Sequence, residues 1–161
     1  AAEARVKVTL ITVGSCCFAF GIAEPSISAA DMIVDTTGAL VVKDFVGFQT
    51  LLTSNSEIDT VYCKAGGAVV QVKDNAGTMV ADTWIKLGFV YDPFSAANHK
   101  MKYFINGVEL GDSVTDAIIA AGTAFPTDEE MTLCLGTKIL TASATAFYCD
   151  WWACGSNLVD N

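Results

Sequence analysis

Few residues of this chain could carry acid–base or nucleophilic chemistry. Glu57 and Asp59 alternate, so on a strand both would share one face, where paired carboxylates could act on a glycosidic bond. His99 is the single histidine of the sequence, so any Ser-His-Asp or Cys-His system would have to use it. It follows Asn98 between two apolar runs, and no pattern places a nucleophile beside it. We interpret Asn98 and His99 as loop residues that could contact a partner or a glycan, and we expect no enzyme activity.

Oxygen-bearing side chains leave calcium open as a ligand. Asp92, Asn98 and Asp112 lie near the ends of expected loops, and residues 128–130 form an acidic cluster. Calcium takes about six to eight oxygen ligands, and the sequence holds no EF-hand loop that would supply them. We therefore expect no bound cofactor and no metal, with a calcium ion as the alternative.

Three tryptophans are candidates for a binding surface. Trp84 lies in an alternating run, and Trp151 and Trp152 are adjacent. Adjacent residues of a strand point to opposite faces, so one of Trp151 and Trp152 should belong to the core and the other to the outer face. The outer ring could form a subunit contact or a platform that stacks on a sugar ring. The apolar surplus of the chain favours the subunit contact.

The cysteines allow two interpretations. No two of them have the C-x-x-C spacing of a structural zinc site. Five lie among apolar residues, which is typical of free thiols that act as small buried hydrophobes in a reducing cytoplasm. Disulfides in a secreted protein remain the alternative. The six are Cys16, Cys17, Cys63, Cys134, Cys149 and Cys154.

Composition excludes several classes of protein. The 161 residues predict one domain, and 52% of them are apolar while 17% are charged, which excludes a disordered chain. Nine basic residues against eighteen acidic ones give a net charge of -9, which argues against nucleic acid as a partner. The longest apolar run, residues 10–22, is too short and too interrupted to span a membrane. So apolar a chain should expose surface that copies of itself cover.

Short apolar runs separated by turn residues dominate the sequence. Residues 84–91 alternate strictly, residues 16–22 form a nearly continuous run expected to be buried on both faces, and Asn106-Gly107 is a strong hairpin signal. Only residues 114–121 have helical character. We expect a single all-β domain over residues 1–161, an antiparallel β-sandwich of jelly-roll type with about eleven to thirteen strands and almost no helix.

The first residues precede the clear alternation. We expect residues 1–5 to form an extended arm outside the sandwich. Its side chains would reach a neighbouring subunit or another protein, and the candidates for this contact are Ala1, Ala2, Glu3 and Arg5.

Three segments in the second half of the chain resemble the concanavalin A-like jelly roll of laminin-G modules, legume lectins, pentraxins and family-16 glucanases. WIKLGFVYD at residues 84–92 resembles the central strand, YFINGV at 103–108 the hairpin, and FYCDWW at 147–152 the closing strand. Family-16 glucanases carry Glu-x-Asp-x-x-Glu on one strand. Here Glu57 and Asp59 match, but Tyr62 stands where the acid/base glutamate belongs, so the resemblance implies the fold without catalysis.

A second resemblance is to virion proteins of tailed bacteriophages, including head decoration (cement) proteins. It rests on FGIAEP at residues 20–25, GFQT at 47–50, YCKAGG at 62–67 and LGFVYDP at 87–93. The resemblance implies a structural protein on the capsid exterior, synthesised in the host cytoplasm. Its partners would be the major capsid protein and copies of itself, with a trimer expected. The alternative is a carbohydrate-binding, lectin-like module.

Overall fold

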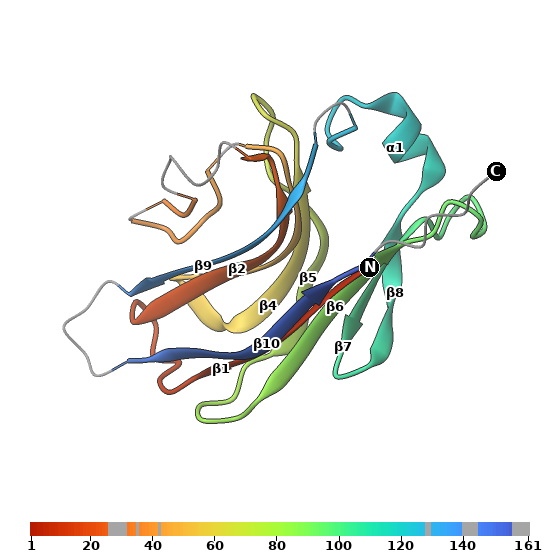
Figure 1. Ribbon diagram of the computed structural model, residues 1–161. Coiled ribbons are helices and arrows are strands. Elements are labelled where there is room, and N and C mark those ends of the chain that lie inside the picture. Colours follow the sequence, from red (N-terminus) through yellow and green to blue (C-terminus); the bar gives the residue numbers. More distant parts are fainter. Residues whose placement is uncertain (26–31, 35, 42, 128–129, 140–144, 156–161) are drawn as a thin grey trace.

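The chain folds into two antiparallel sheets of five strands that pack face to face (Figure 1). The computed structural model describes residues 1–25, 32–34, 36–41, 43–127, 130–139 and 145–155. Within them lie β1 (Ala2–Val8), β2 (Cys16–Ala23), β3 (Phe45–Leu51), β4 (Ser54–Cys63), β5 (Val70–Thr78), β6 (Ile85–Tyr91), β7 (Met101–Ile105), β8 (Val108–Val114), α1 (Asp116–Ala121), β9 (Thr132–Ile139) and β10 (Phe147–Cys154).

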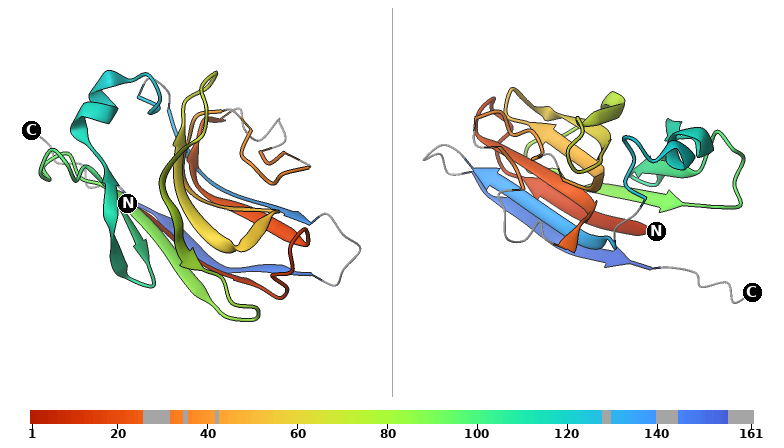
Figure 2. Two further views of the ribbon diagram at one scale, coloured as in Figure 1. Left: turned by 180° about the vertical axis from the view of Figure 1, so that it is seen from behind. Right: turned by 90° about the horizontal axis from the view of Figure 1, so that it is seen from above.

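The strand order places β9 and β10 on the same side of the sandwich. One sheet, sheet A, has the order β10-β1-β6-β7-β8, and the other, sheet B, has the order β5-β4-β3-β2-β9. The view from above shows β9 and β10 along one margin of the two layers (Figure 2). The expected antiparallel β-sandwich with almost no helix is therefore confirmed. The described residues form ten strands instead of eleven to thirteen, and Ile33 and Leu40 make only an isolated bridge.

The expected N-terminal arm is wrong for residues 2–5. These residues begin β1, which is hydrogen-bonded to β10 on one side and to β6 on the other. Ala2 and Ala4 point into the core beside Val6, while Glu3 and Arg5 point outward. The sequence pattern did not indicate this strand because two of its inward residues are alanines. Ala2 and Ala4 are buried, but alanine is only weakly hydrophobic, so the alternation of apolar and polar residues is hard to recognise.

The predicted hairpin and helix are both present. Asn106 and Gly107 have φ of 52° and 80° and connect β7 to β8, as a tight turn with two left-handed residues requires. Within the predicted segment 114–121, α1 begins after Thr115, whose side chain accepts a hydrogen bond from the backbone N–H of Ile118. It ends at Gly122, which has a φ of 59°.

Sheet B is buried on both faces near β2, as the continuous apolar run predicts. Phe18 and Phe20 point into the core between the sheets. Cys17 and Ala19 point to the opposite face, where the segment containing Ile33 and Leu40 covers them in a second, smaller apolar cluster.

Four aromatic rings form the centre of the main core. Phe20 and Phe48 come from sheet B, and Phe89 and Tyr103 come from sheet A. Each ring contacts two of the others, with centroids 5.5 to 6.5 Å apart. Contacts of this kind add about 0.5–1.5 kcal/mol per pair beyond the burial of apolar area.

The two long margins of the sandwich differ. At one margin the Lys73 Nζ of β5 lies 2.7 Å from the Asp112 Oδ2 of β8, so an ion pair joins the two sheets. At the other margin, side chains of β9 and β10 that point inward remain in contact with solvent. We call the exposed apolar side chains of this set the open edge; its members are Ile139, Cys149, Trp152 and Cys154.

A glycine pair allows β2 and β3 to approach. Gly21 lies opposite Gly47, and a Cβ at position 47 would collide with the carbonyl oxygen of Phe20 and lie 2.6 Å from the Cα of Gly21. We predict that Gly47→Ala lowers the free energy of unfolding by about 3 kcal/mol, because backbone atoms cannot move aside as a side chain can. Gly111→Ala is the control, since a Cβ there meets nothing within 4 Å. Denaturant unfolding of both variants checks this, and equal stability would contradict it.

Candidate functional site

The outer face of sheet A gathers aromatic and cationic side chains in an otherwise acidic protein. Glu3, Arg5 and Lys7 point outward from β1 because Ala2, Ala4, Val6 and Val8 occupy the inward positions. Their neighbours on β6 and β10 continue this face. We call the group the outer patch; it comprises Arg5, Lys7, Trp84, Lys86, Tyr148 and Trp151.

A β-bulge at Asp150 determines which side chains of β10 join the outer patch. Arg5 pairs with Trp151, and the next residue, Val6, pairs with Cys149, so Asp150 is the extra residue. Tyr148 and Trp151 consequently share the outer face, although strict alternation would separate them. The Asp150 carboxylate accepts a hydrogen bond from the Arg5 guanidinium, with 2.7 Å between Nη1 and Oδ2, which holds the bulge against β1.

Cations lie against the aromatic rings of the patch. The Arg5 guanidinium carbon is 5.0 Å and the Lys7 Nζ is 5.3 Å from the centre of the Trp84 ring. The Lys86 Nζ is 5.7 Å from the Trp151 ring centre and 2.7 Å from the Glu3 Oε1. Such cation–π contacts contribute about 0.5–1 kcal/mol at exposed sites, so they orient the rings without fixing them rigidly.

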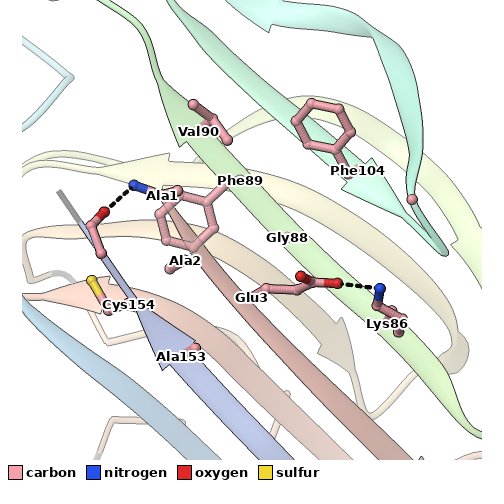
Figure 3. A pocket seen from close by; sticks show the side chains of 12 residues that line it. Ala1, Ala2, Glu3, Lys86, Gly88, Phe89, Val90, Phe104, Ala153 and Cys154 are labelled. Carbon is pink, nitrogen blue, oxygen red and sulfur yellow. Dashed lines mark hydrogen bonds and ion pairs between the residues drawn. The ribbon is translucent and has the colours of Figure 1, made fainter. Parts of the chain in front are cut away.

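A hollow of about 550 Å³ adjoins the patch (Figure 3). Gly88 leaves its floor without a side chain, while the Glu3–Lys86 ion pair lies on one side and Phe104 and Val90 on another. Ala153 and Cys154 of β10 complete the wall. The hollow thus offers a mainly apolar surface with one carboxylate and one ammonium group at its rim.

The two adjacent tryptophans lie on opposite faces, as expected, but neither belongs to the core. Trp151 pairs with the outward Arg5 and is 37% exposed. Trp152 pairs with the inward Ala4 and is nevertheless 51% exposed. The expectation that one of them is a core residue is therefore wrong. It fails because Trp152 points inward at the open edge, where the main core no longer covers it.

The structure does not bring the predicted loop residues to the tryptophans. The backbone carbonyl of Asn98 accepts a hydrogen bond from Ser113 Oγ of β8 at 2.6 Å. The His99 Nδ1 lies 3.7 Å from the Glu109 Oε1, also on β8. Because β8 and β10 are the two opposite edges of sheet A, Asn98 and His99 form a separate location from Trp151 and Trp152.

Of the two carboxylates singled out for hydrolysis, Glu57 is partly exposed and Asp59 is buried. Asp59 is 2% exposed and accepts a hydrogen bond from the backbone N–H of Asn75 at 3.0 Å. Burial raises the pKa of the Asp59 carboxyl, and hydrogen bonds from Asn75, Gln71 and Gln49 oppose this shift. These hydrogen bonds connect Asp59 of β4 to β5 and β3. Because the carboxylate is buried, it is not positioned to contact a substrate.

Two of the oxygen ligands considered for calcium, Asp92 and Asp112, have other partners. The Asp92 Oδ1 accepts a hydrogen bond from the backbone N–H of Phe94, and Asp112 pairs with Lys73. Among the described residues, no three His, Cys, Asp or Glu side chains come together as metal ligands would. Residues 128 and 129 of the acidic cluster lie outside the described part of the chain.

All six cysteines are free thiols, as the apolar surroundings predict. Cys16, Cys17 and Cys63 are buried as expected, but the expectation of a buried thiol is wrong for Cys149 and Cys154, which are exposed because β10 lies at the edge of its sheet. Burial raises the pKa of the Cys17 thiol to about 11 and that of the Cys134 thiol to about 12. These two thiols carry almost no thiolate near neutral pH and are poor nucleophiles.

Trp84 was among the candidates from the sequence, whereas Lys7, Lys86 and Tyr148 are patch residues that sequence reasoning missed. The signal was present, because the charged residues 3, 5 and 7 alternate with Ala2, Ala4, Val6 and Val8. If alanine is counted as a core residue, this alternation predicts a strand with one buried face and one charged face.

Comparisons with known proteins add no relative. The chain matches no protein-family model, no curated protein and no solved structure. Across the described residues, no helix is both long enough and apolar enough to cross a membrane.

The thiols provide a test of the burial pattern. We predict that in dilute native protein a thiol-reactive chromogenic reagent modifies Cys149 and Cys154 quickly, and the four others only after unfolding. The double variant Cys149→Ser/Cys154→Ser should lose the fast phase. Fast modification of Cys134 in folded protein would contradict the arrangement of β9 on β2.

Proposed function

We propose that the protein is a non-enzymatic structural component of a virion, a cement protein that decorates a bacteriophage capsid through contacts between its own copies and the major capsid protein. The open edge is the observation that carries the proposal. Trp152, Cys149 and Ile139 are exposed beside the outer edges of β10 and β9, which have no strand partner among the described residues, and such a surface is suited to another protein.

Charge and fold agree with this role. The net charge of -9 gives particles that carry many copies a repulsive outer surface and keeps them dispersed. The two-sheet architecture is compatible with the concanavalin A-like jelly roll that residues 84–92, 103–108 and 147–152 resemble. The link to a phage head rests on the resemblance of the segments within residues 20–93 to virion proteins. Many weak contacts made at once give such a shell its strength through avidity.

Counting copies in the particle tests the proposal. In purified virions of the source system, quantitative mass spectrometry should find this chain in a ratio near one to the major capsid protein, or at one copy per three-fold cluster. These ratios follow because a cement protein must occupy every equivalent position of the shell. Absence from the particle, or only a few copies, would reject the capsid role and favour a tail-borne or free binding protein.

A second candidate function is carbohydrate binding, which the outer patch and the hollow favour. Trp151 offers a partly exposed ring on the outer face. Lys86 links this ring to Glu3 at the rim of the hollow, so an ammonium and a carboxylate could bond to sugar hydroxyls. An aromatic face beside polar groups suits the apolar face of a pyranose.

A matched pair of variants separates this candidate from the first. If the patch binds glycans, Trp151→Ala should abolish retention on a glycan array, because it removes the outer ring. Phe94→Ala should leave glycan binding unchanged, because Phe94 is an exposed aromatic residue beyond the end of β6 and does not line the hollow. No glycan binding by the unmodified protein, or equal loss in both variants, would reject a glycan site on the outer patch.

A further inference from the structure

β10 is an edge strand with little protection against pairing. It is the last strand of sheet A, and among the described residues β1 is its only strand partner. Seven of its eight residues are exposed, and its sequence, FYCDWWAC, contains neither Pro nor Lys. The backbone N–H and C=O groups along the free side of such a strand are a template for another strand.

The other sheet edges carry the features that usually prevent pairing. β5 holds Lys73 and Asp74 and has two register shifts, and β8 holds Glu109 and Asp112. β9 carries Lys138. Charges and irregularities of this kind protect edges. β10 has one charged residue, Asp150, and the Arg5 of the same sheet neutralises it.

The bulge makes the facing pattern of β10 symmetrical. Along the strand, inward positions are 147, 149, 152 and 154, and outward positions are 148, 150, 151 and 153. Read from either end the order is the same, with its centre between Asp150 and Trp151. A regular strand of eight residues lacks this symmetry, because its two ends point to opposite faces.

We propose that β10 pairs antiparallel with β10 of a second copy of this chain, in the register centred between Asp150 and Trp151. In this register every inward residue lies opposite an inward residue and every outward residue opposite an outward one. Cys149 faces the second copy's Trp152, Tyr148 faces its Ala153, and Phe147 faces its Cys154. The two five-stranded sheets then continue into one sheet across a two-fold axis.

Charge at this contact is compatible with two copies of an acidic chain. The Asp150 of each copy would lie beside the other copy's Trp151, and each brings its own Arg5 at 2.7 Å. At the centre of the contact, the two Arg5 guanidinium groups neutralise the two Asp150 carboxylates. Each copy still has a net charge of -9, but the resulting repulsion between the copies acts over longer distances and is screened by dissolved ions. The exposed Trp152 and Cys149 lose contact with water in the dimer, which favours association.

The oligomeric state of the purified chain tests the contact without any capsid, so its failure is distinguishable from failure of the proposed function. Light scattering after size exclusion should give twice the 17.0 kDa chain mass for the unmodified protein. Trp152→Lys should give the monomer at the same concentration, because an inward charge protects an edge. Val108→Lys is the control: Val108 is 67% exposed on β8, at the other edge of sheet A, and its variant should stay dimeric. A monomeric unmodified protein, or a dimer that persists in Trp152→Lys, would overturn the proposal.

Crosslinking tests the register while both tryptophans remain in place. In a Tyr148→Cys/Ala153→Cys variant that also carries Cys149→Ser and Cys154→Ser, mild oxidation should link position 148 of one copy to position 153 of the other. Directly opposed strand residues have Cα atoms about 4.5–5.5 Å apart, within the range of a disulfide. Peptide mass spectrometry of the covalent dimer identifies the link. A 148–148 or 153–153 link, or no covalent dimer, would overturn this register.

Discussion

The contact of four aromatic rings between the sheets is the interaction on which the rest of the structure depends. Phe20, Phe48, Phe89 and Tyr103 contact one another in a closed cycle, and the Tyr103 hydroxyl, completely enclosed, donates to the Val61 carbonyl at 3.5 Å. Burial raises the pKa of this hydroxyl, so it remains a neutral donor. The cycle centres the core on β2, β3, β6 and β7. Both β9 and β10 lie outside those strands on the same side, which explains why the inward side chains of the open edge are poorly covered.

The sequence predicts the fold class because its strongest local signals agree with the final packing. Strict alternation gives β6, the Asn106-Gly107 pair gives the β7–β8 hairpin, and the continuous apolar run gives a β2 buried on two faces. Strand order is not accessible in this way, because it depends on pairings between residues more than a hundred positions apart, such as Ala19 with Gly136. No local pattern distinguishes that partner from other apolar runs of similar length.

The candidate site was predicted in its components and not in its arrangement. Arg5 and Trp151 were both expected at a contact, but the pairing that places them side by side joins β1 to β10. The arm prediction failed because Ala2 and Ala4 are core residues with almost no hydrophobic signal. The tryptophan prediction failed on a different ground. Alternation assigns opposite faces correctly, yet whether an inward side chain is covered depends on its distance from the aromatic cycle.

The single bulge at Asp150 connects the two surfaces of β10. It brings Tyr148 and Trp151 together on the outer face, and it also makes the inward positions symmetrical along the strand. Pairing through β10 would therefore use the open edge and leave the outer patch uncovered. Because an antiparallel pair continues the sheet, the two outer patches and their hollows would lie on the same side of the joined sheet. A dimer of this form would present two equal sites to a capsid or a glycan-coated surface, and simultaneous binding at both raises the overall affinity without any new contact.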